Sequence, residues 1–137
     1  MLKSYDVAVV GGGAAGLVAA ISAGRKGLSV VICDRMPRLG KKLLITGGGR
    51  CNLLNENLVP ESFTTTSGEL VASVLGRFGK EAIRGFFKGL GLEMVSEGAR
   101  VFPVANQASS VVKVLELDLA TIINLLRFSR NRMVYRG

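Results

Sequence analysis

The stretch Asp6-Val-Ala-Val-Val-Gly-Gly-Gly-Ala-Ala-Gly-Leu17 decides the fold of this 137-residue chain. The segment from Tyr5 to Val10 is short, apolar and rich in β-branched residues, which is typical of a central parallel strand buried on both faces. Glycines 11, 13 and 16 match the G-x-G-x-x-G pattern, in which a strand turns directly into a helix. The stretch therefore predicts the first strand and helix of an α/β domain.

Each of the three glycines has a separate physical role in this pattern. Gly11 lets the chain turn sharply out of the strand, and Gly13 leaves room for a pyrophosphate to approach backbone N–H groups. Gly16 lets the helix pack closely on the strand. Because the N-terminus of a helix carries the positive end of its dipole, the pattern predicts an anion site there.

The flanking sequence completes a βαβ unit. Small and apolar residues from Ala14 to Gly24 give the helix an apolar stripe, and Gly27 is well placed to end it. Leu28 to Cys33 is predicted to be a second buried strand. Asp34 follows eighteen residues after Gly16, where a carboxylate accepts the ribose 2′-OH. The order predicts a dinucleotide site, and a glycine-rich turn in an unrelated α/β domain is the alternative.

Asp34 also bears on the kind of dinucleotide, because its charge would repel a 2′-phosphate and so disfavours NADP. The basic residues nearby weaken this argument, since an arginine beside the acid can accommodate such a phosphate. They are Arg35, Arg38, Lys41 and Lys42. This unit alone does not separate FAD from NAD.

The net charge of +8 is local rather than general. Residues 25–50 hold seven Lys and Arg against the single Asp34, and the last nineteen residues hold four Arg and no acid. No aromatic residues alternate with the first cluster, as they would in a binder of single-stranded nucleic acid. We therefore expect no nucleic-acid partner, and a nucleic-acid-binding protein is the alternative that we rank last.

The composition further limits the class of protein. The two cysteines, Cys33 and Cys51, are too few for a disulfide scaffold, and without histidine we expect no metal site of the usual zinc kind. A reducing, cytoplasmic location is expected. Val7 to Gly24 carries no charge, but glycines interrupt it and a cationic start is almost missing, so we expect no membrane segment.

A second segment, Gly40-Lys-Lys-Leu-Leu-Ile-Thr-Gly-Gly-Gly-Arg-Cys-Asn52, is more specific than the first. Together with Asp6 to Leu17 and with Arg100-Val-Phe-Pro103, it resembles the BaiN-like, or aminoacetone-oxidase-type, family of NAD(P)/FAD-dependent flavoproteins, from about Tyr5 to Leu117. The resemblance implies a Rossmann-like, glutathione-reductase-like FAD domain with a parallel sheet. It also implies FAD as the cofactor, NAD(P)H as a possible reductant, and a separate substrate-side domain inserted later in the chain.

The resemblance implies two groups of cofactor-binding residues. Those that line the pyrophosphate and the adenosine ribose are Gly11, Gly13, Ala14, Ala15, Gly16, Asp34 and Arg35. Those that approach the flavin are Lys42, Thr46, Gly47, Gly48, Gly49, Arg50, Cys51 and Asn52. Three consecutive glycines let backbone N–H groups converge on an anion or a flat ring, and Arg50 or Lys42 could balance the pyrophosphate charge. A mobile surface loop is the alternative for the glycines.

Cys51 has two possible roles, as a redox-active thiol or as a small residue packed against the cofactor. The lack of a C-x-x-C partner favours the second role. Cys33 lies in a predicted core strand and is expected to be inert. No acid or base stands out near the motifs, so we predict no catalytic side chain.

Residues 53–104 are predicted to form a helical and β-hairpin excursion from the FAD-binding part, residues 1–119. After a loop from Asn52 to Ser67, helices are expected over Gly68 to Phe78 and over Lys80 to Leu90. A hairpin is expected from Glu93–Val95 and Arg100–Phe102, with Arg100 as a solvated cation. Asn106 or Ser109 is expected to cap a further helix through Leu119. The second helix carries an apolar stripe that we assign to the core: Ile83, Phe86, Phe87 and Leu90.

After Leu119 the sequence departs from the family pattern, and residues 120–137 are predicted to be a divergent basic tail. We therefore expect a chain that is truncated before the full domain closes. The function expected from the resemblance is that of the FAD-binding N-terminal part of an oxidoreductase. A non-catalytic dinucleotide-binding remnant is the alternative, and the sequence predicts no substrate.

Overall fold

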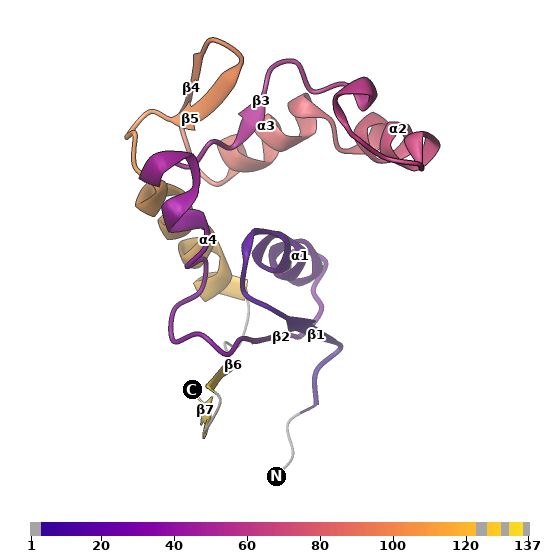
Figure 1. Cartoon of the computed structure of the whole chain (residues 1–137). Helices are drawn as coiled ribbons and strands as arrows, with labels where there is room; N and C mark the ends of the chain where they lie inside the picture. The colour runs from indigo at the N-terminus through magenta and orange to yellow at the C-terminus, as the bar shows by residue number, and fades with distance from the viewer. Residues whose placement is uncertain (1–3, 123–125, 130–131, 136–137) are drawn as a thin grey trace.

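The computed structural model of the chain describes residues 4–122, 126–129 and 132–135. It has two parts (Figure 1). One is a pair of parallel strands with the first helix across it, and the other is an extension of two helices and a small antiparallel sheet, which lies on the side of that first helix away from the strands. None of its helices is long and apolar enough to cross a membrane, within the residues described.

The predicted βαβ unit is present. Strand β1 (Val7–Val10) pairs in parallel with β2 (Val30–Cys33), from Val7 opposite Val30 to Val10 opposite Cys33. Helix α1 (Ala14–Gly24) connects them and buries Leu17 and Ile21 against the core that also contains Ile32. Gly27 follows the helix with a φ of 80°, a left-handed conformation that favours glycine and ends the helical path.

The prediction that β1 is buried on both faces is wrong. Val7 and Val9 are half-buried, but Ala8 and Val10 on the other face are exposed, Val10 to 88%. Among the described residues β1 pairs only with β2, so nothing covers that face or the free edge. The expectation holds for β2, where the consecutive residues Val30, Val31 and Ile32 are all buried.

Helix α4 (Ala108–Ile122) packs its apolar face on α1 and on the 3-10 segment η1 (Leu43–Gly49). Its buried residues are Ala108, Val111, Val112, Leu115 and Leu119. An ion pair between Arg25 and Asp118, 3.1 Å apart, also joins the end of α1 to α4. The predicted cap is wrong, because the helix begins at Ala108, so neither Asn106 nor Ser109 directly precedes it. The Asn106 amide oxygen instead accepts a hydrogen bond from Arg50.

The segment predicted as a basic tail contains two short strands. Strand β6 (Leu126–Ser129) pairs with β7 (Arg132–Tyr135) in antiparallel register. Strand β6 also contacts β2, so α4 returns the chain to the side of the parallel pair.

The extension follows the prediction, with two short elements added. Helices α2 (Gly68–Arg77) and α3 (Lys80–Gly89) and the hairpin of β4 (Met94–Glu97) and β5 (Arg100–Pro103) are present, and Arg100 is exposed. The segment predicted as a loop contains a further strand, β3 (Leu54–Asn55), and a short 3-10 turn, η2 (Pro60–Ser62). Because β3 pairs with β5, the sheet has the order β3-β5-β4.

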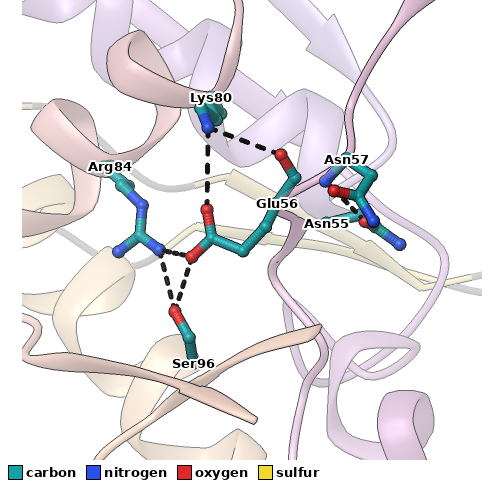
Figure 2. Close-up of polar contacts among 6 residues, drawn as sticks. All are labelled: Asn55, Glu56, Asn57, Lys80, Arg84 and Ser96. Atoms are coloured by element: carbon teal, nitrogen blue, oxygen red, sulfur yellow. Dashed lines mark hydrogen bonds and ion pairs between the residues drawn. The ribbon is translucent and has the colours of Figure 1, made fainter. Parts of the chain in front are cut away.

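A polar cluster around Glu56 holds the extension together (Figure 2). The Glu56 carboxylate accepts hydrogen bonds from Arg84 of α3 and from the Ser96 hydroxyl of β4, the latter at 2.5 Å. The ammonium of Lys80 lies 3.9 Å from the other carboxylate oxygen and donates to the Glu56 backbone carbonyl at 3.4 Å. The Ser96 hydrogen bond, followed by the charges of Arg84 and Lys80, lowers the pKa of Glu56.

The apolar stripe of α3 is less buried than we predicted. Phe86, Phe87 and Leu90 pack against the edge of the core, but all three, like Ile83, are only half-buried. Phe86 and Phe87 line an open cavity of about 480 Å³ together with Val18 of α1 and the exposed Phe78. The stripe therefore faces α1 without closing over it, because α3 belongs to the extension rather than to the βαβ unit.

Candidate cofactor site

The N-terminus of α1 is open and uncapped, as an anion site requires. Gly11 has a φ of 102°, and its N–H donates to the Cys33 carbonyl at the end of β2, at 2.8 Å. No side chain caps α1 at Gly13, no acid lies in its first turn, and Ala14 and Ala15 are exposed. A Cβ atom added at Gly13 would meet nothing within 4 Å in the described part of the chain. No side chain thus occupies the first-turn N–H groups as a cap, which leaves them available to an anion.

Gly16 performs the packing role that we predicted for it. A Cβ atom at this position would lie 1.8 Å from the Gly11 carbonyl oxygen and 3.2 Å from Cγ1 of Val9. Because a backbone carbonyl cannot move as a side-chain end can, the crossing of α1 over β1 needs glycine here.

Asp34 lies beside this turn and binds its backbone. One carboxylate oxygen accepts the Gly12 N–H at 2.5 Å, and the other accepts the Met36 N–H at 2.7 Å. A carboxylate oxygen has two acceptor sites, so each one retains an acceptor for a ribose hydroxyl. The structure thus brings Asp34 against Gly12, within the glycine pattern, and the exposed Arg35 follows Asp34 directly.

Gly12 belongs to this site although sequence reasoning missed it. Its N–H is held by Asp34, and its carbonyl accepts the Gly40 N–H at 2.7 Å. A Cβ atom on Gly12 would lie 2.2 Å from Cδ2 of the buried Leu39. The available signal was the run of three glycines, since the G-x-G-x-x-G pattern leaves its second position open.

The second predicted group begins at Lys42, directly before the 3-10 segment η1 (Leu43–Gly49), and ends at Asn52 after it. The segment is interrupted at Thr46, and Gly47, Gly48 and Gly49 follow with φ values of 55°, 66° and 86°. Three successive left-handed residues define a turn that only glycine forms at low cost, and all three are exposed. Gly47 is also sterically required, because a Cβ atom there would lie 2.7 Å from the Asn52 backbone nitrogen.

Some residues around this turn are exposed, and others are held in place by hydrogen bonds. Lys42 and Asn52 are exposed. Thr46 donates its hydroxyl to the Leu43 carbonyl at 2.7 Å and accepts the Cys51 N–H on its own carbonyl at 2.9 Å. These two bonds fix both ends of the glycine turn. Gly40 connects the turn to the first group, because its N–H binds Gly12.

Cys51 is buried in the core, with a φ of 61°. Burial raises the pKa of its thiol, and a weaker hydrogen bond with Thr46 acts in the opposite sense. A raised pKa keeps the thiol protonated, which argues against a reactive thiolate. Of the two roles considered for Cys51, the packed one agrees better with this environment, and contact with a cofactor stays a prediction.

The contacts of Arg50 do not support a role in balancing the charge of the pyrophosphate. Its Nε donates to Asn106 and its Nη2 to the Glu97 carboxylate, while its guanidinium lies 3.9 Å from the centre of the Phe102 ring. Neither Glu97 nor Asn106 was predicted to belong to the site. A parallel βαβ unit with an open, glycine-turned helix N-terminus and a carboxylate at the end of the second strand defines a Rossmann-type dinucleotide-binding domain.

Comparison with known proteins gives the family. The HI0933-like protein Rossmann domain matches residues 5–131, and the chain belongs to this family. The chain is thus an FAD-binding Rossmann domain, as the resemblance implied. The match continues past Leu117, where the sequence analysis ended the resemblance. The division of the chain at residue 119 stays a prediction.

The relatives are much longer than this chain. A 3-dehydro-bile acid delta(4,6)-reductase from Clostridium scindens is 40% identical over 115 residues, which are 82% of this chain and 28% of the reductase. A ribosomal RNA dihydrouridine synthase from Escherichia coli is 34% identical over 77 residues, 56% of this chain and 19% of the synthase. The crystal structure of Thermovibrio ammonificans THI4 has the same fold, with a TM-score of 0.60 at 16% identity, over 90% of this chain and 38% of that one.

Proposed function

We propose that this chain is the FAD-binding part of a flavin-dependent oxidoreductase. The observation that carries the proposal is the open N-terminus of α1 beside Asp34, in a chain 40% identical to a named reductase. FAD supplies the hydride and electron transfer when it is bound, while the protein supplies binding and orientation.

In the proposed complex the residues around α1 hold the adenosine half of FAD. The first-turn N–H groups of α1 bind the pyrophosphate, and Gly13 gives the phosphate oxygens access to them. Asp34 accepts a ribose hydroxyl with the acceptor sites that Gly12 and Met36 leave free. Arg35 lies beside this ribose. The complete adenosine group comprises Gly11, Gly13, Ala14, Ala15, Gly16, Asp34 and Arg35.

The glycine turn after η1 is proposed to contact the flavin half. Its three left-handed glycines present backbone rather than side chains to the solvent, which suits a flat ring or its ribityl chain. Lys42 and Asn52 are exposed beside the turn, and Cys51 supports it from the core side. The complete group comprises Lys42, Thr46, Gly47, Gly48, Gly49, Arg50, Cys51 and Asn52.

We assign no residue of this chain to the binding of the substrate. The relatives are named for a bile acid and for ribosomal RNA, and they share with this chain only a part that is 28% or 19% of their length. These names are explained most simply if the relatives carry out the same kind of redox step on different substrates. We propose NAD(P)H as the reductant on the basis of the family resemblance.

A cytoplasmic location and the absence of a nucleic-acid partner stay proposals. Cys33 and Cys51 are both free thiols, which agrees with a reducing compartment. The exposed Arg35 directly follows Asp34, so FAD bound there would account for part of the local positive charge without a nucleic acid.

Titration with FAD tests the proposed function. Purified chain should bind FAD at one equivalent, ADP should compete because it carries the same ribose and pyrophosphate, and riboflavin should bind weakly. Addition of NAD(P)H should then bleach the flavin absorbance. A chain that ignores FAD overturns the proposal, and one that binds FAD but is never reduced is a binding domain rather than an enzyme.

A further inference from the structure

Four side chains from separate segments meet beside the glycine turn, and we call them the Arg50 latch: Arg50, Glu97, Phe102 and Asn106. Arg50 directly follows the turn. Glu97 ends β4, Phe102 lies on β5, and Asn106 precedes α4. The latch therefore connects the turn to the hairpin and to the start of a core helix.

The guanidinium of Arg50 is fixed from several directions at once. Its Nε donates to Asn106, its Nη2 donates to Glu97, and its face covers the Phe102 ring at 3.9 Å. The planar fork of arginine fixes the directions of its donors, so two such partners define its orientation. The Glu97 carboxylate also balances its charge.

The backbone beside Arg50 needs such support. Gly47, Gly48, Gly49 and Cys51 are all in the left-handed region, and a flexible glycine run would lose this conformation easily. The hairpin also touches the turn directly, since Phe102 Cε1 lies 3.3 Å from the position of a Cβ atom on Gly47. Thus Phe102 contacts both the turn and the arginine that ends it.

We propose that Glu97 and Asn106 are positioning residues for the flavin half of the site, acting through Arg50. This inference depends on the proposed function, because it assumes that the glycine turn contacts FAD. Neither residue touches the cofactor in this scheme. They hold Arg50, and Arg50 holds the turn in the shape that the flavin meets.

The test is a set of variants of the whole chain, titrated separately with FAD and with ADP. Glu97→Ala removes the acceptor and the charge, and Asn106→Gly removes the amide while tolerating the φ of 54°. Each should raise the Kd for FAD about fivefold, the size of effect typical of directly coupled residues. The Kd for ADP should stay within about twofold, because ADP meets only the site at α1.

Control variants separate positioning from loss of folding. Glu93→Gln removes an exposed carboxylate that has no ion pair in the described chain, and it should leave both Kd values unchanged. Asn106→Asp keeps an acceptor for Arg50 and should restore FAD binding. A general loss of folding would instead weaken ADP and FAD together and lower the Tm.

A double-mutant cycle tests the route through Arg50. In an Arg50→Met background, Glu97→Ala should have no further effect on the Kd for FAD. The visible spectrum of bound FAD should change in the single variants, because a displaced turn alters the surroundings of the ring. Unchanged FAD affinity in both Glu97→Ala and Asn106→Gly, or an equal effect without Arg50, overturns the inference. Failure of the unaltered chain to bind FAD overturns the proposed function as well.

Discussion

Gly13 and Gly16 stand three residues apart at the start of α1, yet an added methyl group meets different surroundings at each. At Gly16 it would collide with the Gly11 carbonyl, whereas at Gly13 it would point into open space. One glycine is thus needed by the fold, and the other is needed only if a ligand approaches. Replacing each of these two glycines by alanine therefore tests folding and binding separately.

Gly16→Ala should lower the free energy of unfolding by about 1–3 kcal/mol or more, because the added carbon overlaps backbone that cannot move cheaply. Urea denaturation followed by circular dichroism measures this change. A variant whose unfolding free energy stays within about 0.5 kcal/mol of the original chain would show that α1 can shift on β1.

Gly13→Ala should leave the fold almost intact, with a cost of about 1 kcal/mol or less for alanine at a helix N-cap. Its Kd for FAD should rise at least about tenfold, or about 1.4 kcal/mol, because the methyl group occupies the path of the pyrophosphate. Titration by flavin absorbance measures it, and Gly76→Ala on α2 is the control, because a Cβ atom there also meets nothing within 4 Å in the described chain. Equal FAD affinity would place the pyrophosphate elsewhere.

At the scale of elements, the extension is held together both by the buried apolar residues Leu54, Val101 and Phe102 and by the polar cluster around Glu56. Glu56 follows β3 and joins it to α3 and β4 (Figure 2). Helix α3 packs the half-buried Phe86 and Phe87 against the edge of the core, beside an open cavity that Val18 of α1 also lines. The stability of the extension should therefore respond to conditions that change the charge of Glu56.

The chain should lose stability in acid through Glu56. Its folded-state pKa is lowered, so the contribution of the cluster is complete above the unfolded-state pKa of glutamate, near 4.3, and disappears as the pH falls through the folded pKa. Unfolding in urea at about pH 7 and about pH 3.5 should show a smaller acid loss in Glu56→Gln than in the original chain.

Asp6, whose pKa is lowered mainly by the Ser29 hydroxyl, contributes a loss in the same direction, so only the difference between variants counts. Glu61→Gln is the matched control, since Glu61 is exposed and has no ion pair among the residues described. If Glu56→Gln and Glu61→Gln respond equally to acid, the cluster does not stabilise the extension.

The elements also show which parts of the fold could be predicted from the sequence. Periodicity and glycine spacing predicted β1, α1, β2, the two helices and the hairpin, because each depends on local pattern. Strand β3 is two residues long in a polar segment, so only its partner β5 reveals it. Arg50 was predicted as a site residue, but its contacts with Glu97 and Asn106 span about fifty residues and leave no local signal.

At the scale of the whole molecule, the parallel sheet is small and open. Strand β1 has a free edge within the described chain, and Ala8 and Val10 are exposed beside it. The matched relatives are more than three times as long as the region they share with this chain. A strand read from sequence as central is thus an edge strand here, because burial depends on neighbours that a pattern of apolar residues cannot reveal.

An unprotected edge strand tends to pair with other chains, so this chain should self-associate as its concentration rises. Sedimentation equilibrium measures the association. Ala8→Lys should weaken it, because a lysine on an edge strand opposes strand addition, whereas Ser109→Lys adds the same charge at an exposed position of α4 and should not. Equal association of both variants would place the contact elsewhere.

Gly12 has both of its backbone polar groups occupied, the N–H by Asp34 and the carbonyl by Gly40. The phosphate-facing turn is therefore ordered before any ligand arrives, and little conformational entropy remains to be lost when the pyrophosphate docks. Binding of the nucleotide half should accordingly follow simple one-step kinetics, with an association rate set by diffusion and charge rather than by a slow rearrangement of the loop.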